Sequence, residues 1–125
     1  MKIKTGIDII EVDRIQEAIE SQGEIFLNKV YTKNEINYCS NTGKMTYQHY
    51  AARFAAKEAI FKAISDIIPK EENNILNKIE IINEKSGKPI ANLDKLHIEN
   101  IESMDLSLSH IKNYAIASFT LLLNI

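Results

Sequence analysis

Two polar side chains near the middle of the chain have the spacing to present an acid and a base on one face of a helix. The segment from Arg53 to Ala63 is rich in Ala and in long unbranched side chains, which favours a helix. On that helix Glu58 and Lys62 lie roughly 40° apart, because each residue turns the helix by about 100°. Such a pair taken alone is usually a solvent-facing ion pair worth a few tenths of a kcal/mol.

A second carboxylate near the start of the chain changes this interpretation. Asp8 stands within Gly6-Ile7-Asp8-Ile9-Ile10, an otherwise apolar run that predicts a strand. A buried carboxylate costs free energy unless it is paired, hydrogen-bonded or bound to a cation. The ordinary explanation is an acid bonded to a nearby helix N-terminus. The functional explanation is a metal site that Asp8 shares with Glu58.

The types of the available ligands select the metal. Two carboxylates without nitrogen or sulfur partners suit Mg²⁺, which completes its shell with water and substrate phosphates. The three histidines, His49, His97 and His110, show no zinc-ligand spacing. We therefore expect metal-assisted chemistry on a phosphate-containing substrate.

The sequence has no Gly-rich phosphate loop, so basic side chains would have to bind the phosphates. Arg53 is about 140° around the helix from Glu58, which makes it either structural or part of a site shared between subunits. The candidate phosphate ligands are Arg53, Lys57, Lys62, Lys88 and His110.

The elements that position these residues form a mixed α and β pattern. Small residues from Ala52 to Ala63 make a stripe suited to close packing, within a long central helix predicted over 47–65. Capping boxes at Asp13/Gln16 and Thr32/Glu35 predict two shorter helices, at 13–21 and from 32 to about 39–43. A weak helical spacing covers 94–103.

Strands and turns account for the remainder. Strands are predicted at 3–10 and 79–83, a polar loop at 70–77, and a turn at 86–89 before another short strand. Alternation over 106–109 and 114–123 predicts an antiparallel hairpin. The expected class is α+β, with an antiparallel sheet packed on a long central helix in a single domain, 1–125.

Composition excludes several classes of protein. A hydrophobic fraction of 45% with 26% charged residues is typical of an ordinary globular domain. The net charge of −2 gives no basic field for nucleic acid or a membrane surface, and no apolar run is long enough to span a bilayer. The single cysteine, Cys39, and the absence of a signal peptide favour the cytoplasm.

Four segments occur in an order that resembles one family. They are the run from Gly6 to Ile15, the segment from Arg53 to Ala63, Ser86-Gly87-Lys88-Pro89, and Leu106-Ser107-Leu108-Ser109-His110. The chain resembles the holo-[acyl-carrier-protein] synthases, the small bacterial 4′-phosphopantetheinyl transferases, over nearly its whole length. This resemblance implies the fold of that family and a role in fatty acid biosynthesis.

The resemblance also implies a reaction. Coenzyme A would donate its 4′-phosphopantetheine arm to a serine of apo-acyl carrier protein, releasing adenosine 3′,5′-bisphosphate. Asp8 and Glu58 would hold Mg²⁺, with Lys62 as a third catalytic residue that contacts the pyrophosphate. The base that removes the serine proton stays open between Lys62, a metal-bound water and a carboxylate.

Further roles follow by the same resemblance. The enzyme would be a homotrimer with active sites at subunit interfaces, where Arg53 of a neighbour reaches the coenzyme A phosphates. The adenine and 3′-phosphate side would be lined by Gly87, Lys88, Pro89, Ser109 and His110. Arg14 would dock the acidic carrier protein. It is the only cation of its helix, so docking would be more apolar or helped by Lys29, Lys33 and Lys44.

Two other classes remain as alternatives. A Mg²⁺-dependent phosphohydrolase could use the same carboxylates with water as nucleophile, but the sequence offers no further acid or His cluster to activate water. A catalytically silent module could hold coenzyme A or a carrier protein. The presence of Asp8, Glu58 and Lys62 together argues against it.

Overall fold

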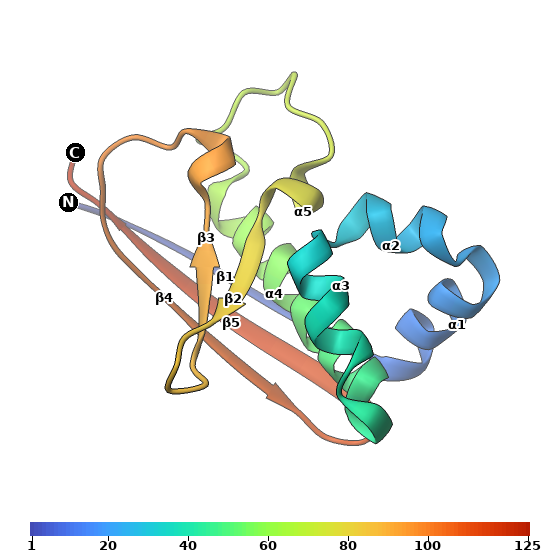
Figure 1. The fold of residues 1–125 in the computed structure, drawn as a ribbon. Coiled ribbons are helices and arrows are strands. Elements are labelled where there is room, and N and C mark those ends of the chain that lie inside the picture. Colours follow the sequence, from blue (N-terminus) through green and yellow to red (C-terminus); the bar gives the residue numbers. More distant parts are fainter.

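A computed structural model describes residues 1–125 as a long sheet with helices on one face (Figure 1). The helices are α1 (Val12–Gln22), α2 (Glu24–Val30), α3 (Lys33–Ser40), α4 (Thr46–Ile64) and α5 (Ile75–Lys78), with 3₁₀ turns at Gly43–Met45 and Asp94–Leu96. The strands are β1 (Lys2–Glu11), β2 (Glu80–Asn83), β3 (Pro89–Asn92), β4 (Ile101–His110) and β5 (Tyr114–Leu123). The predicted α+β class is confirmed.

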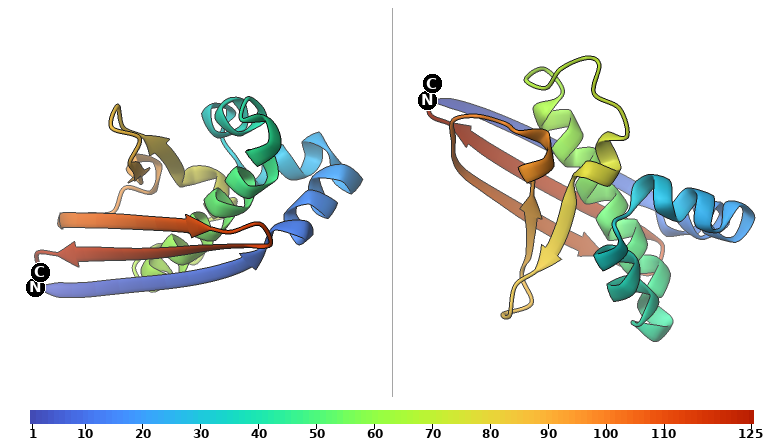
Figure 2. Two further views of the ribbon diagram at one scale, coloured as in Figure 1. Left: turned by 90° about the horizontal axis from the view of Figure 1, so that it is seen from below. Right: turned by 45° about the horizontal axis from the view of Figure 1, so that its top comes forward.

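The main sheet is antiparallel with the order β1-β5-β4, and β2 and β3 form a separate antiparallel hairpin. In its register Asp8 pairs with Ala117, while His110 pairs with Ala115 on the other side of β5. Figure 2 shows that the helices and the β2–β3 hairpin lie on the same side of this sheet. The other face of the sheet is left without a covering layer.

Strand alternation decides which β1 side chains meet the helices. The even positions of β1 from Lys4 to Ile10 are half-buried toward α4, whereas the odd positions are exposed. The three exposed isoleucines of this strand are Ile3, Ile7 and Ile9. Asp8 therefore lies on the face that α4 covers.

The central helix packs on the sheet through small side chains, as the stripe predicted. Its residues Ala55, Ala56, Ala59 and Ala63 are all buried in the larger hydrophobic core. Their small size lets the helix axis approach the strands closely. Gly6 marks the closest point, because a Cβ atom built there would lie 1.7 Å from the carbonyl oxygen of Ala59.

We expect Gly6→Ala to destabilise the protein by about 3 kcal/mol or more, since the methyl group would push α4 away from β1. Chemical denaturation of the purified variant measures this loss. Thr5→Ser is the matched control, because Thr5 is exposed on the opposite face of the strand. Equal stabilities for Gly6→Ala and wild type would contradict the close approach.

Several predicted boundaries are wrong in informative ways. The helix predicted over 94–103 is one 3₁₀ turn followed by β4, which starts at Ile101. The Asp13/Gln16 capping box is absent, because α1 begins at Val12 with no side-chain cap at Glu11. The Thr32/Glu35 box is present. The loop predicted over 70–77 contains the start of α5, and α2 had no predicted counterpart.

The predicted turn at 86–89 forms as expected. The amide of Gly87 donates to the carbonyl of Glu84 at 2.7 Å, and Gly87 has a positive φ of 91°, which a glycine adopts easily. This turn joins β2 to β3. As for a membrane, no helix combines the length and the apolar character that a bilayer crossing requires.

Candidate active site

Asp8 and Lys62 meet where β1 runs beneath the last turns of α4. The Lys62 Nζ atom lies 3.1 Å from Asp8 Oδ1 and donates to the carbonyl of Ile7 at 2.9 Å. The Asp8 side chain is largely buried, while that of Lys62 is half-exposed. The strand carboxylate is thus paired, and its partner is a lysine that also reaches solvent.

Glu58 lies one turn before Lys62 and completes this group. Its side chain is partly buried, and desolvation together with the negative charge of Asp8 raises the pKa of Glu58, while Lys62 acts to lower it. The structure therefore brings Asp8, Glu58 and Lys62 together in one electrostatic cluster. We name these three residues the carboxylate–lysine site.

The donor chemistry of this site fits Mg²⁺. No group of three or more His, Cys, Asp or Glu side chains in the chain could hold a metal ion by itself. Two adjacent carboxylates, one of them partly desolvated, are the ligand set of an ion that takes its other ligands from water and phosphates.

A pocket of about 270 Å³ opens beside Glu58. It is bordered by the end of α2, by α4 and by the start of α5. Its lining residues are Lys29, Val30, Glu58, Phe61, Asn74, Ile75 and Leu76. A mainly apolar pocket bordered by Glu58 can hold an extended organic chain whose charged end faces the cluster.

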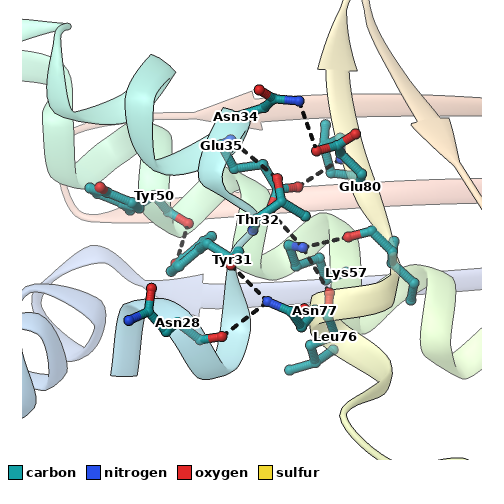
Figure 3. A network of polar contacts seen from close by, with 12 residues as sticks. Asn28, Tyr31, Thr32, Asn34, Glu35, Tyr50, Lys57, Leu76, Asn77 and Glu80 are labelled. Atoms are coloured by element: carbon teal, nitrogen blue, oxygen red, sulfur yellow. Dashed lines mark hydrogen bonds and ion pairs between the residues drawn. The ribbon is translucent and has the colours of Figure 1, made fainter. Parts of the chain in front are cut away.

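Lys57 is not a phosphate ligand, and that prediction was wrong. Its side chain is 0% exposed and forms an ion pair of 2.7 Å with Glu35, which is equally buried. Figure 3 shows this pair within a polar network between α3, α4 and α5. Burial lowers the pKa of Lys57, and the nearby charge of Glu35 opposes that shift. The helical wheel could not show that α3 and β2 cover this flank.

Arg53 lies one turn before Lys57 on the same flank of α4, away from Glu58. Only 4% of it is exposed. Its guanidinium donates to Asn83 Oδ1 at 2.6 Å and lies 4.2 Å from the centre of the Tyr38 ring. Arg53 and Glu58 thus have different neighbours within one chain, as the wheel predicted.

His49 and His110 border the Arg53 flank, and the role of His49 was missed from sequence. Their ring centres are 5.5 Å apart. Burial, Arg53 and His110 all lower the pKa of His49. Two buried nitrogens here, His49 Nδ1 and Arg53 Nε, have no hydrogen-bond partner. The Nε atom of Arg53 always carries a hydrogen, so this flank has one unpaired donor of the kind that suits an anionic ligand.

The remaining predicted residues lie at the surface. Lys88 forms an ion pair of 2.9 Å with Asp105 of β4, while Pro89 begins β3. Ser109 and His110 line a separate pocket of about 240 Å³ at the end of the sheet. The structure gives these residues no contact with the carboxylate–lysine site.

Arg14 is exposed on α1 and is the only cation of that helix. The shallow depression beside it is lined by Arg14, Glu17, Ala18, Glu20 and Ser21. Acidic residues thus surround the one basic side chain. An acidic partner would meet a mixed surface here.

We expect Glu58→Gln to raise the melting temperature of the metal-free protein at pH 7. Because the pKa of Glu58 is raised, the folded protein binds the proton of this carboxyl group more tightly than the unfolded chain does. The contribution of Glu58 to the stability of the folded state therefore falls as the pH rises through that pKa. The amide removes an unfavourable buried charge, and the gain should shrink toward pH 4. Thermal melts in a chelator check this, with the exposed Glu17→Gln as control. A gain independent of pH would contradict the assignment.

Related proteins match nearly the whole chain. The family model described as the 4′-phosphopantetheinyl transferase superfamily matches residues 4–118. The holo-[acyl-carrier-protein] synthase of Ruminiclostridium cellulolyticum is 46% identical over 122 residues, which are 94% of this chain and 90% of the relative.

Solved structures agree with this match. The Bacillus anthracis holo-(acyl-carrier-protein) synthase in complex with CoA (3′,5′-ADP) has a TM-score of 0.76 at 35% identity, over 94% of both chains. The Helicobacter pylori synthase in complex with coenzyme A has a TM-score of 0.78 at 30% identity, over 94% of this chain and 99% of that one. The chain therefore belongs to the 4′-phosphopantetheinyl transferase superfamily, among the holo-[acyl-carrier-protein] synthases.

Proposed function

We propose that this protein transfers the 4′-phosphopantetheine arm of coenzyme A to a serine of apo-acyl carrier protein. The products are holo-acyl carrier protein and adenosine 3′,5′-bisphosphate, and the reaction supports fatty acid biosynthesis in the cytoplasm. One observation carries the proposal: Asp8 and Lys62 lie near Glu58, which borders a mainly apolar pocket, in a chain related to synthases solved with coenzyme A.

We further propose that Asp8 and Glu58 hold Mg²⁺ during transfer. When bound, this ion would neutralise charge on the pyrophosphate and stabilise the leaving phosphate. The two carboxylates suit that role because they lie at one site and Mg²⁺ takes its other ligands from water and substrate phosphates.

The chain's own residues would supply orientation. Lys62 presents a half-exposed ammonium that Asp8 and the carbonyl of Ile7 hold in place, and this charge would attract the pyrophosphate of coenzyme A. The apolar wall formed by Val30 and Phe61 would keep the pantetheine arm beside the site and limit access of water. The serine hydroxyl would attack the phosphorus that bears the arm, and the bond to the second phosphate would break.

We propose that active sites form between subunits of a homotrimer. The uncovered face of the sheet exposes Ile3, Ile7, Ile9 and Ile116, an apolar surface suited to self-association. Arg53 is on the flank of α4 opposite Glu58, so it would serve a neighbouring site. There Arg53 and His110, with His49 beside them, would bind phosphate groups of coenzyme A.

Carrier docking would use α1 and its surroundings. Arg14 would contact an acidic residue of the carrier protein, with Lys29 at the rim of the Glu58 pocket as a second cation. Gly87, Lys88, Pro89 and Ser109 would complete the side of the site that faces adenine.

Mass spectrometry of the carrier protein tests the proposed function. Apo-acyl carrier protein, coenzyme A and Mg²⁺ are incubated with the enzyme, and the carrier is weighed. The proposal predicts a mass gain of one phosphopantetheine group that requires the carrier serine. Phosphate release without a change in the carrier would favour a phosphohydrolase, and coenzyme A binding without any reaction would favour a silent binding module.

A further inference from the structure

The buried ion pair between Lys57 and Glu35 has no part in the proposed chemistry, yet it lies at the centre of a polar network that joins several elements (Figure 3). The Lys57 ammonium has three partners: Glu35 Oε1 at 2.7 Å, the carbonyl of Leu76 at 2.7 Å and the carbonyl of Ile79 at 2.5 Å. These contacts match its three hydrogens, so its donors are fully used.

The carboxylate of Glu35 forms hydrogen bonds with two further elements. Its Oε1 atom accepts the amide of Thr32 at 2.8 Å and so caps α3, while Oε2 accepts the amide of Ile81 on β2 at 2.7 Å. One ion pair thereby fixes α3, the end of α5 and the start of β2 to the central helix. We call the segment Asn74–Ile81 the strap.

The two ends of the strap are held differently. Ile79 and Ile81 are buried in the larger hydrophobic core, whereas the four-residue helix α5 has no buried residue. The polar contacts therefore matter most for the α5 part of the strap. The other firm contact comes from Asn77, whose amide donates to the carbonyls of Asn28 and Tyr31 at 3.0 and 2.8 Å.

Both ends of the strap reach residues of the proposed site. Asn74, Ile75 and Leu76 form one wall of the pocket beside Glu58. Beyond Ile81, β2 ends at Asn83, which holds the guanidinium of Arg53. The contacts of Lys57 with Leu76 and of Glu35 with Ile81 therefore control positions on both flanks of α4.

We propose that Lys57 is a positioning residue that holds the strap as a fixed wall of the coenzyme A pocket. This inference rests on the proposed function, since it assigns the pocket to that substrate. A buried ion pair is seldom the most stable filling for a core, and apolar residues of similar volume often do as well or better. An ion pair differs from apolar packing because its hydrogen bonds are directional. The ammonium of Lys57 fixes the orientation of the carbonyls of Leu76 and Ile79, which a methyl group cannot do.

The double variant Lys57→Met/Glu35→Gln tests this proposal without leaving a buried charge unpaired. The single oxygen of the glutamine retains an acceptor for the cap at Thr32, while the amide of Ile81 loses its acceptor. Hydrogen exchange in the ligand-free protein should be faster in the strap and unchanged in β4 and β5. In the transfer assay the KM for coenzyme A should rise by about tenfold or more, with a smaller effect on kcat, because the pocket wall is no longer held in its binding position.

Lys78→Met is the matched control, since Lys78 lies in the same strap but its ion pair with Glu72 is partly exposed. It should leave both exchange and KM near wild type. Unchanged exchange in the double variant, or faster exchange with an unchanged KM, would overturn the proposal. If the single variant Lys57→Met fails to fold, the double variant still decides. If the wild-type protein transfers no phosphopantetheine, the proposed function is wrong. In that case the comparison of hydrogen exchange between the double variant and wild type alone decides whether Lys57 fixes the strap.

Discussion

Glu58→Gln and Asp8→Asn are each expected to lower the rate of phosphopantetheine transfer by about 10³-fold or more. Each change removes one of the two carboxylates that would hold Mg²⁺, and a loss of about 4 kcal/mol of transition-state stabilisation corresponds to that factor. Steady-state rates from the carrier mass assay, measured across a range of Mg²⁺ concentrations, give the comparison. Both amides keep the size of the side chain, so the fold should survive.

Asp66→Asn is the matched control for this prediction. Asp66 follows α4 and pairs with Lys4 of β1, as Asp8 pairs with Lys62, but it is exposed and its ion-pair partner lies outside the carboxylate–lysine site. It should transfer at close to the wild-type rate. Full activity in Glu58→Gln or in Asp8→Asn would exclude a two-carboxylate site.

The double variant Ile7→Glu/Ile9→Glu is expected to dissociate the oligomer and to abolish most of the transfer activity. Ile7 and Ile9 are 60% and 61% exposed on the uncovered face of β1, so the isolated fold should tolerate the change. In an assembly each isoleucine would contribute about 1.5–3 kcal/mol through burial, and a buried glutamate would oppose it. Sedimentation velocity measures the mass, and thermal melts confirm folding.

The control for the interface is a change at an exposed isoleucine elsewhere. Ile25→Glu alters α2, where Ile25 is more exposed than either β1 residue. It should leave the oligomer intact. A monomeric wild-type protein, or a fully active Ile7→Glu/Ile9→Glu monomer, would contradict active sites shared between subunits.

Local patterns predicted that the side chains of Asp8, Glu58 and Lys62 lie near one another. The spacing of Glu58 and Lys62 placed them one turn apart on α4, and the carboxylate of Asp8 within an apolar strand predicted that it shares a site with Glu58. The structure adds that Asp8 lies on the face of β1 that α4 covers. These two elements are adjacent because Gly6 and the alanine stripe allow close packing. The pairing of Lys62 with Asp8, and not with Glu58, depended on that packing distance.

Long-range contacts explain the errors. In the sequence Lys57 does not differ from the other lysines of the helix. Its partners Glu35 and Ile79 lie about two dozen residues away on either side of it, and only these long-range contacts show that Lys57 is buried. In the same way, Leu96, Ile98 and Ile101 have helical spacing, but β4 is fixed by its register with β5. The contact between Arg53 and Asn83 joins positions thirty residues apart, so no local pattern could indicate it.

The claim that one helix contributes to two active sites has a direct test by subunit mixing. Asp8→Asn and Arg53→Gln are purified separately, shown to be folded and close to inactive, and then co-assembled in equal amounts. If Arg53 serves a neighbouring site, mixed oligomers contain sites in which both halves are intact, and about one quarter of wild-type transfer should return. If the mixture stays as inactive as its parents while mixed oligomers form, the carboxylates and Arg53 act within one chain, and the shared-site account is wrong.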